Sequence, residues 1–369
     1  MKRQQIRPFY MILIIGVAFL SWVDKTNSNA SQAGARTLRS NLNYPWEILW
    51  GKDDFIWMTE RGGRISKLDP NTGKTVFSTV LTNVVSNNEG GMLGMVQHPG
   101  FLSNGLFYLV YDYTDESGKY LEKMVQLRYA DNEVKVLKTL IDKIPASPIH
   151  NGSRLWITDE ANPKLFMTTG DASVSANAQN LNSVSGKVLR FNLDGSIPAD
   201  NPFPGSFVWS YGHRNQQGIV VANHIMYASE HGPTIEDEVN IIEKKRNYGW
   251  PSVNGPCDDV AEKVFCAAND VKEPIWSSGN STIAVCGLDY YNNPLIPEWQ
   301  HCLLMLTLKD ASLRVLHLSA DGLSVTSQQT LYKGKYGRLR DLCISPTGKV
   351  YLCTSNGGNN DILVEISKP

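Results

Sequence analysis

One histidine in a short polar run has a side chain that could carry out chemistry. His150 begins the run His150-Asn-Gly-Ser-Arg154 and follows Ile149. Imidazole has an ordinary pKa near neutrality, so a histidine held beside a substrate hydroxyl can accept its proton. A histidine in a turn can equally be a plain surface residue, and the run alone leaves both interpretations open.

Several cationic residues stand in equally short segments. Arg214 lies in Tyr211-Gly-His-Arg-Asn-Gln-Gln-Gly218, and two arginines lie in Arg338-Leu-Arg-Asp341. Residues two apart on a strand point to the same side, so Arg338 and Arg340 would present two guanidinium groups together on a strand or its entry. The alternative is a basic pair on the solvent-exposed surface.

Short apolar runs separated by turns must position these residues, because the chain has almost no sustained helical period after residue 40. The predicted strands are Phe55–Met58, Leu106–Tyr111, Leu165–Thr168, Lys187–Phe191, Ile225–Ala228, Leu303–Leu308 and Val350–Cys353. Hairpin turns such as Asp69-Pro-Asn-Thr-Gly73 lie between them, and a Gly-Lys pair begins several strands. The repetition predicts an all-β radial array, in which about 330 residues at about 40–55 per blade give roughly six to eight blades.

The N-terminus has the three-part pattern of a secretory signal. Lys2, Arg3 and Arg7 precede an apolar run over residues 9–20, and small residues at 28–30 offer a cleavage site. The twelve residues of this run are too few for a membrane anchor, which needs about 20. We therefore expect a signal peptide over 1–30, a linker over 31–42 and one propeller domain over 43–369. The protein would be periplasmic or secreted, with no stable membrane insertion of the mature chain.

Composition limits the partners and the compartment. The chain has 35 basic and 36 acidic residues and a formal net charge of −1, which argues against nucleic acid or an anionic membrane as the main partner. Its six cysteines fit an oxidising compartment. Cys257 and Cys266 bracket an Asp-rich segment and could close a small loop, which gives the hypothesis of a disulfide. Buried thiols and disulfides both remain compatible with the apolar surroundings of the other four.

Four segments in a fixed order go beyond this general strand pattern. They are Glu89-Gly-Gly-Met-Leu-Gly94 with His98-Pro-Gly-Phe101, the run from His150, the run from Tyr211, and Glu230-His-Gly-Pro233 continuing to Asp237-Glu-Val-Asn240 and Asn247-Tyr-Gly-Trp-Pro251. In this order they resemble the soluble glucose and aldose sugar dehydrogenases that depend on pyrroloquinoline quinone (PQQ). The resemblance extends from about residue 43 to the C-terminus. That family is a six-bladed β-propeller with its cofactor over the central channel, which implies six blades here.

The resemblance also implies a role for each site residue. His150 matches the catalytic histidine, and Arg214 with Asn215 matches a pair that stabilises charge developing on the quinone oxygens. Gly232-Pro233, which could otherwise be an ordinary turn, matches residues whose carbonyls bind Ca²⁺, a cation that prefers oxygen ligands. The other cofactor-binding positions are Glu89, Thr282, Lys309, Arg338 and Arg340, and the three cations among them suit the carboxylates of PQQ.

The implied reaction is oxidation of an aldose to its lactone, with hydride transfer to the quinone, His150 as general base and an external electron acceptor. Two residues depart from the glucose enzymes, which have glutamine at Glu89 and aspartate at Ile149. Their aromatic platform is also not recognisable around Trp276 to Thr282. An acidic side chain near PQQ would be repelled unless protonated or paired. We therefore expect the aldose branch, with an altered or broader sugar preference.

Two other functions are compatible with a propeller. A calcium-dependent lactonase would rely on convergent carboxylate and asparagine ligands, whereas this chain offers a cationic set. A non-enzymatic extracellular interaction module would be expected to have lost the histidine or those cations. Both are present, which favours the dehydrogenase.

Overall fold

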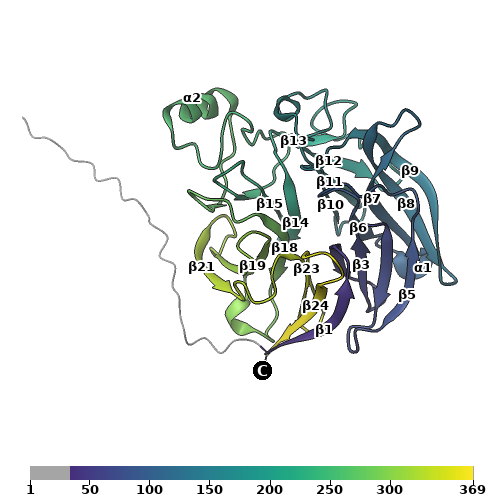
Figure 1. The fold of residues 1–369 in the computed structure, drawn as a ribbon. Helices are drawn as coiled ribbons and strands as arrows, with labels where there is room; N and C mark the ends of the chain where they lie inside the picture. Colours follow the sequence, from purple (N-terminus) through teal and green to yellow (C-terminus); the bar gives the residue numbers. More distant parts are fainter. Residues whose placement is uncertain (1–33, 369) are drawn as a thin grey trace, which may run out of the picture.

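Six four-stranded antiparallel sheets surround a central axis in the computed structural model of the chain, which describes residues 34–368 (Figure 1). Five of these blades consist of four consecutive strands each. The sixth combines the last three strands with the first strand of the described chain. The prediction of an all-β, six-bladed propeller is confirmed.

The strands follow one another blade by blade. Blade 1 contains β2 (Pro45–Trp50), β3 (Ile56–Glu60), β4 (Arg64–Leu68) and β5 (Thr75–Val80). Blade 2 contains β6 (Met92–Gln97), β7 (Leu106–Thr114), β8 (Tyr120–Ala130) and β9 (Glu133–Pro145). Blade 3 contains β10 (Gly152–Ile157), β11 (Lys164–Thr169), β12 (Lys187–Asn192) and β13 (Val208–Tyr211). Blade 4 contains β14 (Gln216–Ala222), β15 (Ile225–Glu230), β16 (Glu238–Ile241) and β17 (Trp276–Ser277). Blade 5 contains β18 (Val285–Tyr291), β19 (Cys302–Thr307), β20 (Leu313–Leu318) and β21 (Val325–Leu331). Blade 6 contains β22 (Leu339–Ile344), β23 (Val350–Thr354), β24 (Asp361–Ser367) and β1 (Gly34–Leu42). The helices are α1 (Phe101–Asn104) and α2 (Val260–Asn269), with 3₁₀ turns at Ser175–Asn177 and Pro297–Trp299.

All seven strands predicted from apolar runs coincide with observed strands, namely β3, β7, β11, β12, β15, β19 and β23. Six of these are the second strands of their blades and β12 is a third strand, and burial on both faces favours continuous apolar runs there. The turn after β4 also has the predicted form, because the Gly73 N–H donates to the Asp69 carbonyl at 2.8 Å. Gly73 has a φ of 69°, a left-handed conformation that glycine adopts without a steric cost.

The first described strand changes the predicted domain boundary. β1 pairs antiparallel with β24, from Gly34 opposite Ser367 to Leu42 opposite Asp361. The predicted linker over 31–42 is therefore wrong for residues 34–42, which form the outer strand of blade 6. Most side chains of β1 are exposed, so the strand has no apolar run that would have revealed it. The predicted signal peptide lies outside the described residues. Within residues 34–368, no helix is long and apolar enough to cross a bilayer.

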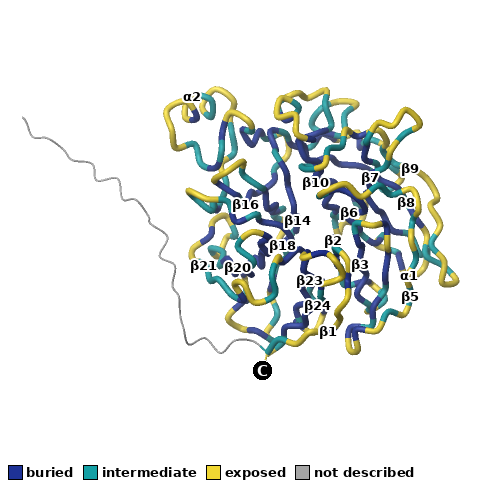
Figure 2. Tube along the Cα trace, in the orientation of Figure 1, coloured by how far each residue is buried: buried dark blue, intermediate teal, exposed yellow. Residues whose placement is uncertain are grey.

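Hydrophobic clusters between neighbouring blades hold the ring together. Trp57 of blade 1 and Phe107 of blade 2 belong to one cluster, with ring centroids 5.9 Å apart. Cys286 of blade 5 and Leu352 of blade 6 belong to another, and both are fully buried. Each blade thus buries its two faces on its neighbours, and Figure 2 shows the buried chain around the axis with exposed segments at the perimeter. This burial fixes the inner strands, which position the site. The inner strand of each blade is its first strand: β2, β6, β10, β14, β18 and β22.

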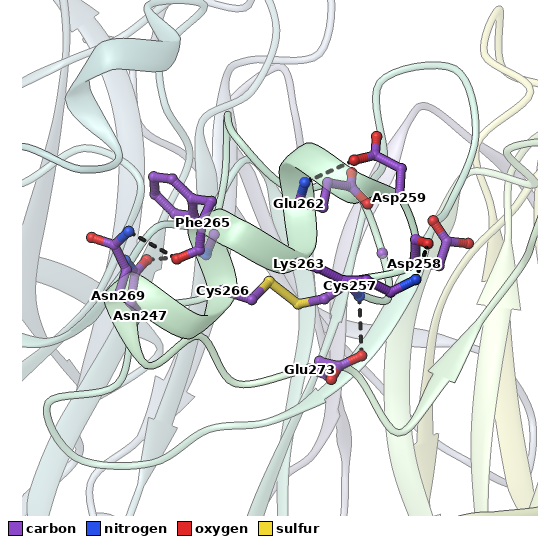
Figure 3. The surroundings of a disulfide bond; sticks show 12 residues. Asn247, Cys257, Asp258, Asp259, Glu262, Lys263, Phe265, Cys266, Asn269 and Glu273 are labelled. Atoms are coloured by element: carbon purple, nitrogen blue, oxygen red, sulfur yellow. Dashed lines mark hydrogen bonds between the residues drawn. A yellow bond between two sulfur atoms is a disulfide. The ribbon is translucent and has the colours of Figure 1, made fainter.

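A disulfide stabilises the long segment between β16 and β17. The Cys257 and Cys266 sulfurs are bonded, with Cα atoms 6.5 Å apart, and the bond joins the segment before α2 to the helix itself (Figure 3). Asp259 caps the helix by accepting from the Glu262 N–H at 2.7 Å. The hypothesis of this disulfide is confirmed, and the other four cysteines are buried free thiols.

Candidate active site

The residues predicted to form a site come together at one end of the central channel. The pocket at this end is lined by the first residues of inner strands, including Trp46, Leu93, Gly152 and Gln217. The predicted site residues fall into two groups, because inner strands begin at the same side of the ring where second strands end. Just before or at the start of inner strands lie Glu89, His150, Arg214, Asn215, Thr282, Arg338 and Arg340. Just after second strands lie Gly232, Pro233 and Lys309.

His150 is held in one orientation by a buried carboxylate. Its Nδ1 lies 2.9 Å from Oδ1 of Asp171, which is 1% exposed. A carboxylate can only accept, so Nδ1 carries the hydrogen and Nε2 is left as the basic nitrogen. Asp171 also accepts from the Trp250 indole N–H at 2.9 Å and from the Ser173 N–H at 2.8 Å. These contacts fix the carboxylate, which in turn fixes the imidazole.

Three arginines and one histidine surround Glu89. Each has one buried side-chain nitrogen without a hydrogen-bond partner among the described residues. The unpartnered atoms are Nε of Arg61, Arg214 and Arg340 and Nε2 of His231. Burial lowers the pKa of each arginine, and the nearby Glu89 carboxylate opposes this shift. Burial also lowers the pKa of His231 to about 4, so its imidazole is neutral at pH 7. The unpartnered buried N–H donors of the three arginines are costly, and an anionic ligand would satisfy them.

The two arginines of the predicted pair differ in burial. Arg340 is 4% exposed and donates from Nη1 to Oε1 of Gln217 at 2.8 Å, whereas Arg338 is exposed. The pairing of β22 with β23 shifts register between Leu339 and Asp341, and such a bulge breaks the alternation of side chains. Only Arg340 therefore lies within the channel, although the charge of Arg338 still acts on Arg61.

A buried aspartate organises the predicted metal-binding turn. Asp237 is fully buried, and its Oδ1 accepts from the Gly232 N–H at 2.9 Å. Its Oδ2 accepts from the N–H groups of residues 283 and 284 at 2.6 and 2.7 Å, which fixes the turn beside Thr282. Lys309 donates to the Thr282 hydroxyl at 3.1 Å. The carbonyl oxygens of Gly232 and Pro233 accept no hydrogen bond from residues 34–368, so they are available to a cation.

Asn215 links the Arg214 segment to the histidine segment. Its side chain is 1% exposed, and Oδ1 accepts from the Gly152 N–H at 3.2 Å. The Arg214 guanidinium donates to the His231 carbonyl at 3.3 Å and lies 5.3 Å from the Trp250 ring. The first residues of blades 3 and 4 are thus joined by polar contacts around His150.

Buried charges close the channel beneath these residues. Nη1 of Arg154 lies 3.0 Å from Glu47 and 2.8 Å from Asp341, and its Nε donates to the Gln217 carbonyl at 2.6 Å. All of these charges are mostly buried and paired, so Arg154 of the predicted histidine run has a structural role. A cavity of about 450 Å³ lies on the other side, towards the far ends of the inner strands.

Sequence reasoning missed part of this site. Asp171 and Arg61 follow second strands and belong to none of the segments that carried the resemblance. His231 and Trp250 stand within those segments but received no role. Trp276, near which an aromatic platform was sought, is 4% exposed and packs in the core between blades 4 and 5.

The comparison with known proteins agrees with this geometry. The sequence profile of the family described as Glucose / Sorbosone dehydrogenase matches residues 42–364. The chain belongs to this family. The family resemblance recognised in the sequence is confirmed, and so is the prediction that the chain is an oxidoreductase.

Individual relatives cover nearly the whole chain. Aldose sugar dehydrogenase YliI of Escherichia coli K12 is 28% identical over 364 residues, covering 94% of this chain and 95% of the relative. Quinoprotein glucose dehydrogenase B of Acinetobacter calcoaceticus is 30% identical over 413 residues, covering 88% of this chain and 86% of the relative. The solved PQQ-bound form of an aldose sugar dehydrogenase from Streptomyces coelicolor matches with a TM-score of 0.76 at 27% identity, covering 92% of this chain and 99% of that one.

Proposed function

We propose that the protein oxidises aldose sugars to lactones with PQQ and Ca²⁺ bound at the mouth of the channel. The observation that supports this most directly is the group of unpartnered buried nitrogens on Arg61, Arg214 and Arg340. PQQ is a planar tricarboxylate, and charge-assisted contacts to its carboxylates and quinone oxygens would satisfy these donors. The PQQ-bound relative from Streptomyces coelicolor supports the same cofactor.

The residues present fit this cofactor and a calcium ion. Arg340 and Arg61, with Arg338, Lys309 and Thr282 nearer the surface, would hold the carboxylates. Arg214 and Asn215 would contact the quinone oxygens, where negative charge develops. The free carbonyls of the Gly232-Pro233 turn would bind Ca²⁺, and the negative charge of Asp237 beneath the turn would stabilise the bound cation.

Glu89 is compatible with an anionic cofactor because cations surround it. Its carboxylate acts on Arg61, Arg214 and Arg340, so its charge is compensated within the pocket. Its N–H donates to the Pro148 carbonyl at 2.9 Å, which places it beside the histidine segment. We propose that Glu89 orients the arginines and contacts the cofactor from the same side.

His150 would act as the general base. When bound, PQQ supplies the acceptor for the hydride that leaves the anomeric carbon of the sugar. Nε2 of His150 takes the proton of the hydroxyl on that carbon, and the C–O bond becomes the lactone carbonyl. Asp171 stabilises the imidazolium that forms, because its carboxylate already accepts from Nδ1. An external electron acceptor, in the periplasm or outside the cell, would be needed to reoxidise the protein after each turnover.

A reconstitution assay tests this proposal. The purified protein is incubated with CaCl₂ and PQQ, and its absorption spectrum is recorded after removal of free quinone. Aldoses are then assayed with an artificial electron acceptor, using protein without PQQ as the control. We expect bound quinone and aldose-dependent reduction of the acceptor. The absence of bound quinone at saturating PQQ and calcium would overturn the proposal.

A further inference from the structure

Two buried carboxylates face each other beneath the histidine segment. Asp112 of β7 and Glu122 of β8 are direct partners in the antiparallel pairing of these strands. Directly opposed residues have their side chains on the same face of the sheet, with Cβ atoms about 4.5–5.5 Å apart. Asp112 is 0% exposed and Glu122 is 1% exposed. Two acidic groups are therefore buried side by side on one face of the sheet.

Each of these carboxylates has one satisfied and one unsatisfied oxygen. Oδ2 of Asp112 accepts from the Gly91 N–H at 2.9 Å, the Tyr120 hydroxyl at 2.7 Å and the Asn151 amide at 3.2 Å. Oε2 of Glu122 accepts from the Ser153 hydroxyl. Oδ1 of Asp112 and Oε1 of Glu122 are buried without any partner in residues 34–368.

No cation compensates the pair. Within the described part of the chain, neither carboxylate forms an ion pair with a lysine, arginine or histidine. The titratable groups that face it are Tyr120, whose pKa is raised by burial and by both carboxylates, and Arg61, which acts on Tyr120. Two adjacent buried carboxylates without a cation cannot both ionise cheaply.

We propose that Asp112 and Glu122 share one proton at neutral pH and form a brace that positions the His150 segment. A carboxylic acid on one residue can donate to the free oxygen of the other, which satisfies both unpartnered atoms with one strong hydrogen bond. The pair then carries a single negative charge, which the donors from Gly91, Tyr120 and Asn151 stabilise.

The shifts in pKa agree with this geometry. Burial raises the pKa of Asp112 to about 7. Burial and then the charge of Asp112 raise the pKa of Glu122 well above its ordinary value. Both groups therefore hold protons in the folded protein at pH values where the unfolded chain has lost them.

The brace connects two segments of the proposed active site. Through Oδ2, Asp112 binds Gly91, two residues after Glu89, and Asn151, which directly follows His150. The approach is close, because a Cβ on Gly90 would lie 2.3 Å from Oδ2 of Asp112. Loss of the shared proton would place two negative charges side by side and force these segments apart. This consequence for His150 rests on the proposed function, whereas the shared proton does not.

Linkage between pH and stability tests the shared proton without any activity assay. The variants are D112N, E122Q and the double variant, with E116Q as the control, because Glu116 is exposed in the turn between β7 and β8. Since both folded pKa values are raised, the contribution of this pair to the stability of the wild type falls as pH rises from the ordinary carboxyl range through about 7 and beyond. Near pH 7–8 the folded wild type should retain about one proton more than the unfolded chain from this pair.

Urea unfolding between about pH 5 and 9 measures that proton through the slope of stability against pH. Near neutral pH, we expect each single variant to lose the extra proton of the folded state, because an amide can donate to the remaining carboxylate without titrating. The double variant should lose no more than this one proton. The control should keep the wild-type slope. Additive losses in the single variants, or unchanged slopes, would show two independent groups and overturn the proposal. A stabilisation by CaCl₂ or MgCl₂ that E122Q loses and E116Q keeps would assign the space to a metal ion instead, which also overturns it.

Turnover of the reconstituted enzyme tests the positioning role. We expect the wild-type rate to fall as the shared proton leaves above neutral pH, and the E122Q rate to persist at least about one pH unit higher, because a neutral glutamine cannot repel Asp112. The rate of E116Q should follow the wild type. Identical alkaline limbs in wild type and E122Q, together with a changed stability slope, would leave the shared proton in place and remove its effect on His150.

Discussion

Arg340 provides a sharp test of how the pocket is built. Arg340 is 4% exposed, and within residues 34–368 its guanidinium makes one hydrogen bond, to Gln217, and has an unpartnered Nε. Burial and the neighbouring positive charges of Arg154 and Arg61 lower its pKa, and Glu89 opposes this only in part. The ligand-free protein therefore holds a poorly compensated buried charge, which is expected if the charge serves a ligand.

Replacing Arg340 with methionine should have opposite effects on stability and on cofactor binding. Exchanging buried ionic groups for apolar side chains of similar volume is often neutral or stabilising by about 1–4 kcal/mol. Losing the hydrogen bond to Gln217 costs about 1 kcal/mol. We therefore expect the free energy of unfolding of R340M without PQQ to exceed that of the wild type by about 0–3 kcal/mol. A lost charge-assisted contact of about 1.5–3 kcal/mol should weaken PQQ affinity about 10- to 150-fold.

Denaturant unfolding without PQQ and quinone titration with calcium measure the two effects. R338M is the matched control for the stability measurement, because Arg338 is exposed and its replacement should change stability by no more than about 0.5 kcal/mol. If R340M is less stable than the wild type by more than about 1 kcal/mol, the guanidinium is already compensated and the reasoning fails. Unchanged PQQ affinity would remove Arg340 from the cofactor site.

Three further predictions concern the base, a buried lysine and the disulfide. H150A should lower turnover at least ~100-fold with PQQ binding retained. D171N should lower turnover by about 10²–10⁴-fold, because it favours the wrong tautomer of His150. Steady-state kinetics measure turnover and quinone titration measures PQQ binding, and near-normal rates would exclude these roles. Burial lowers the pKa of Lys187 to about 7, so Lys187 should add a rise in stability with pH from about 7 towards the ordinary lysine pKa, opposing the fall expected from Asp112 and Glu122. K187M should lack this rise in urea unfolding, and an equal slope would contradict a depressed pKa. Reducing the Cys257–Cys266 bond should lower the free energy of unfolding by about 2–3 kcal/mol, from the entropy of the closed loop. Unfolding with and without reductant measures this difference, and equal stabilities would show that the disulfide adds nothing.

The sequence was sufficient to predict the blades but not every strand. Runs such as Leu303–Leu308 are apolar throughout because both faces of the strand are buried, and that signal is local. β1 has mostly exposed side chains and is held by pairing with β24, more than 300 residues away in the chain. α2 was also missed, because Val260 and Val264 are exposed while Glu262 is buried, the reverse of the usual amphipathic pattern.

The predicted site residues were found through short segments, and the structure places them around one channel mouth. The residues that were missed act through geometry that only the closed ring creates. Asp171 meets His150 across a separation of 21 residues, and the unpartnered nitrogen of His231 has meaning only beside Glu89 and Arg340. The buried pair of Asp112 and Glu122 reads in the sequence as two ordinary charges, because strand pairing alone brings them together.

The sharing of blade 6 between the two ends of the chain has a consequence for the order of synthesis. Among the strands of residues 34–368, β1 is made first, yet its partner in the sheet, β24, is completed last. Until release from the ribosome, blades 1 and 5 present their unmatched flanks to solvent, and such incomplete species are prone to aggregate. Late closure therefore delays the mature fold until the whole polypeptide has been translated.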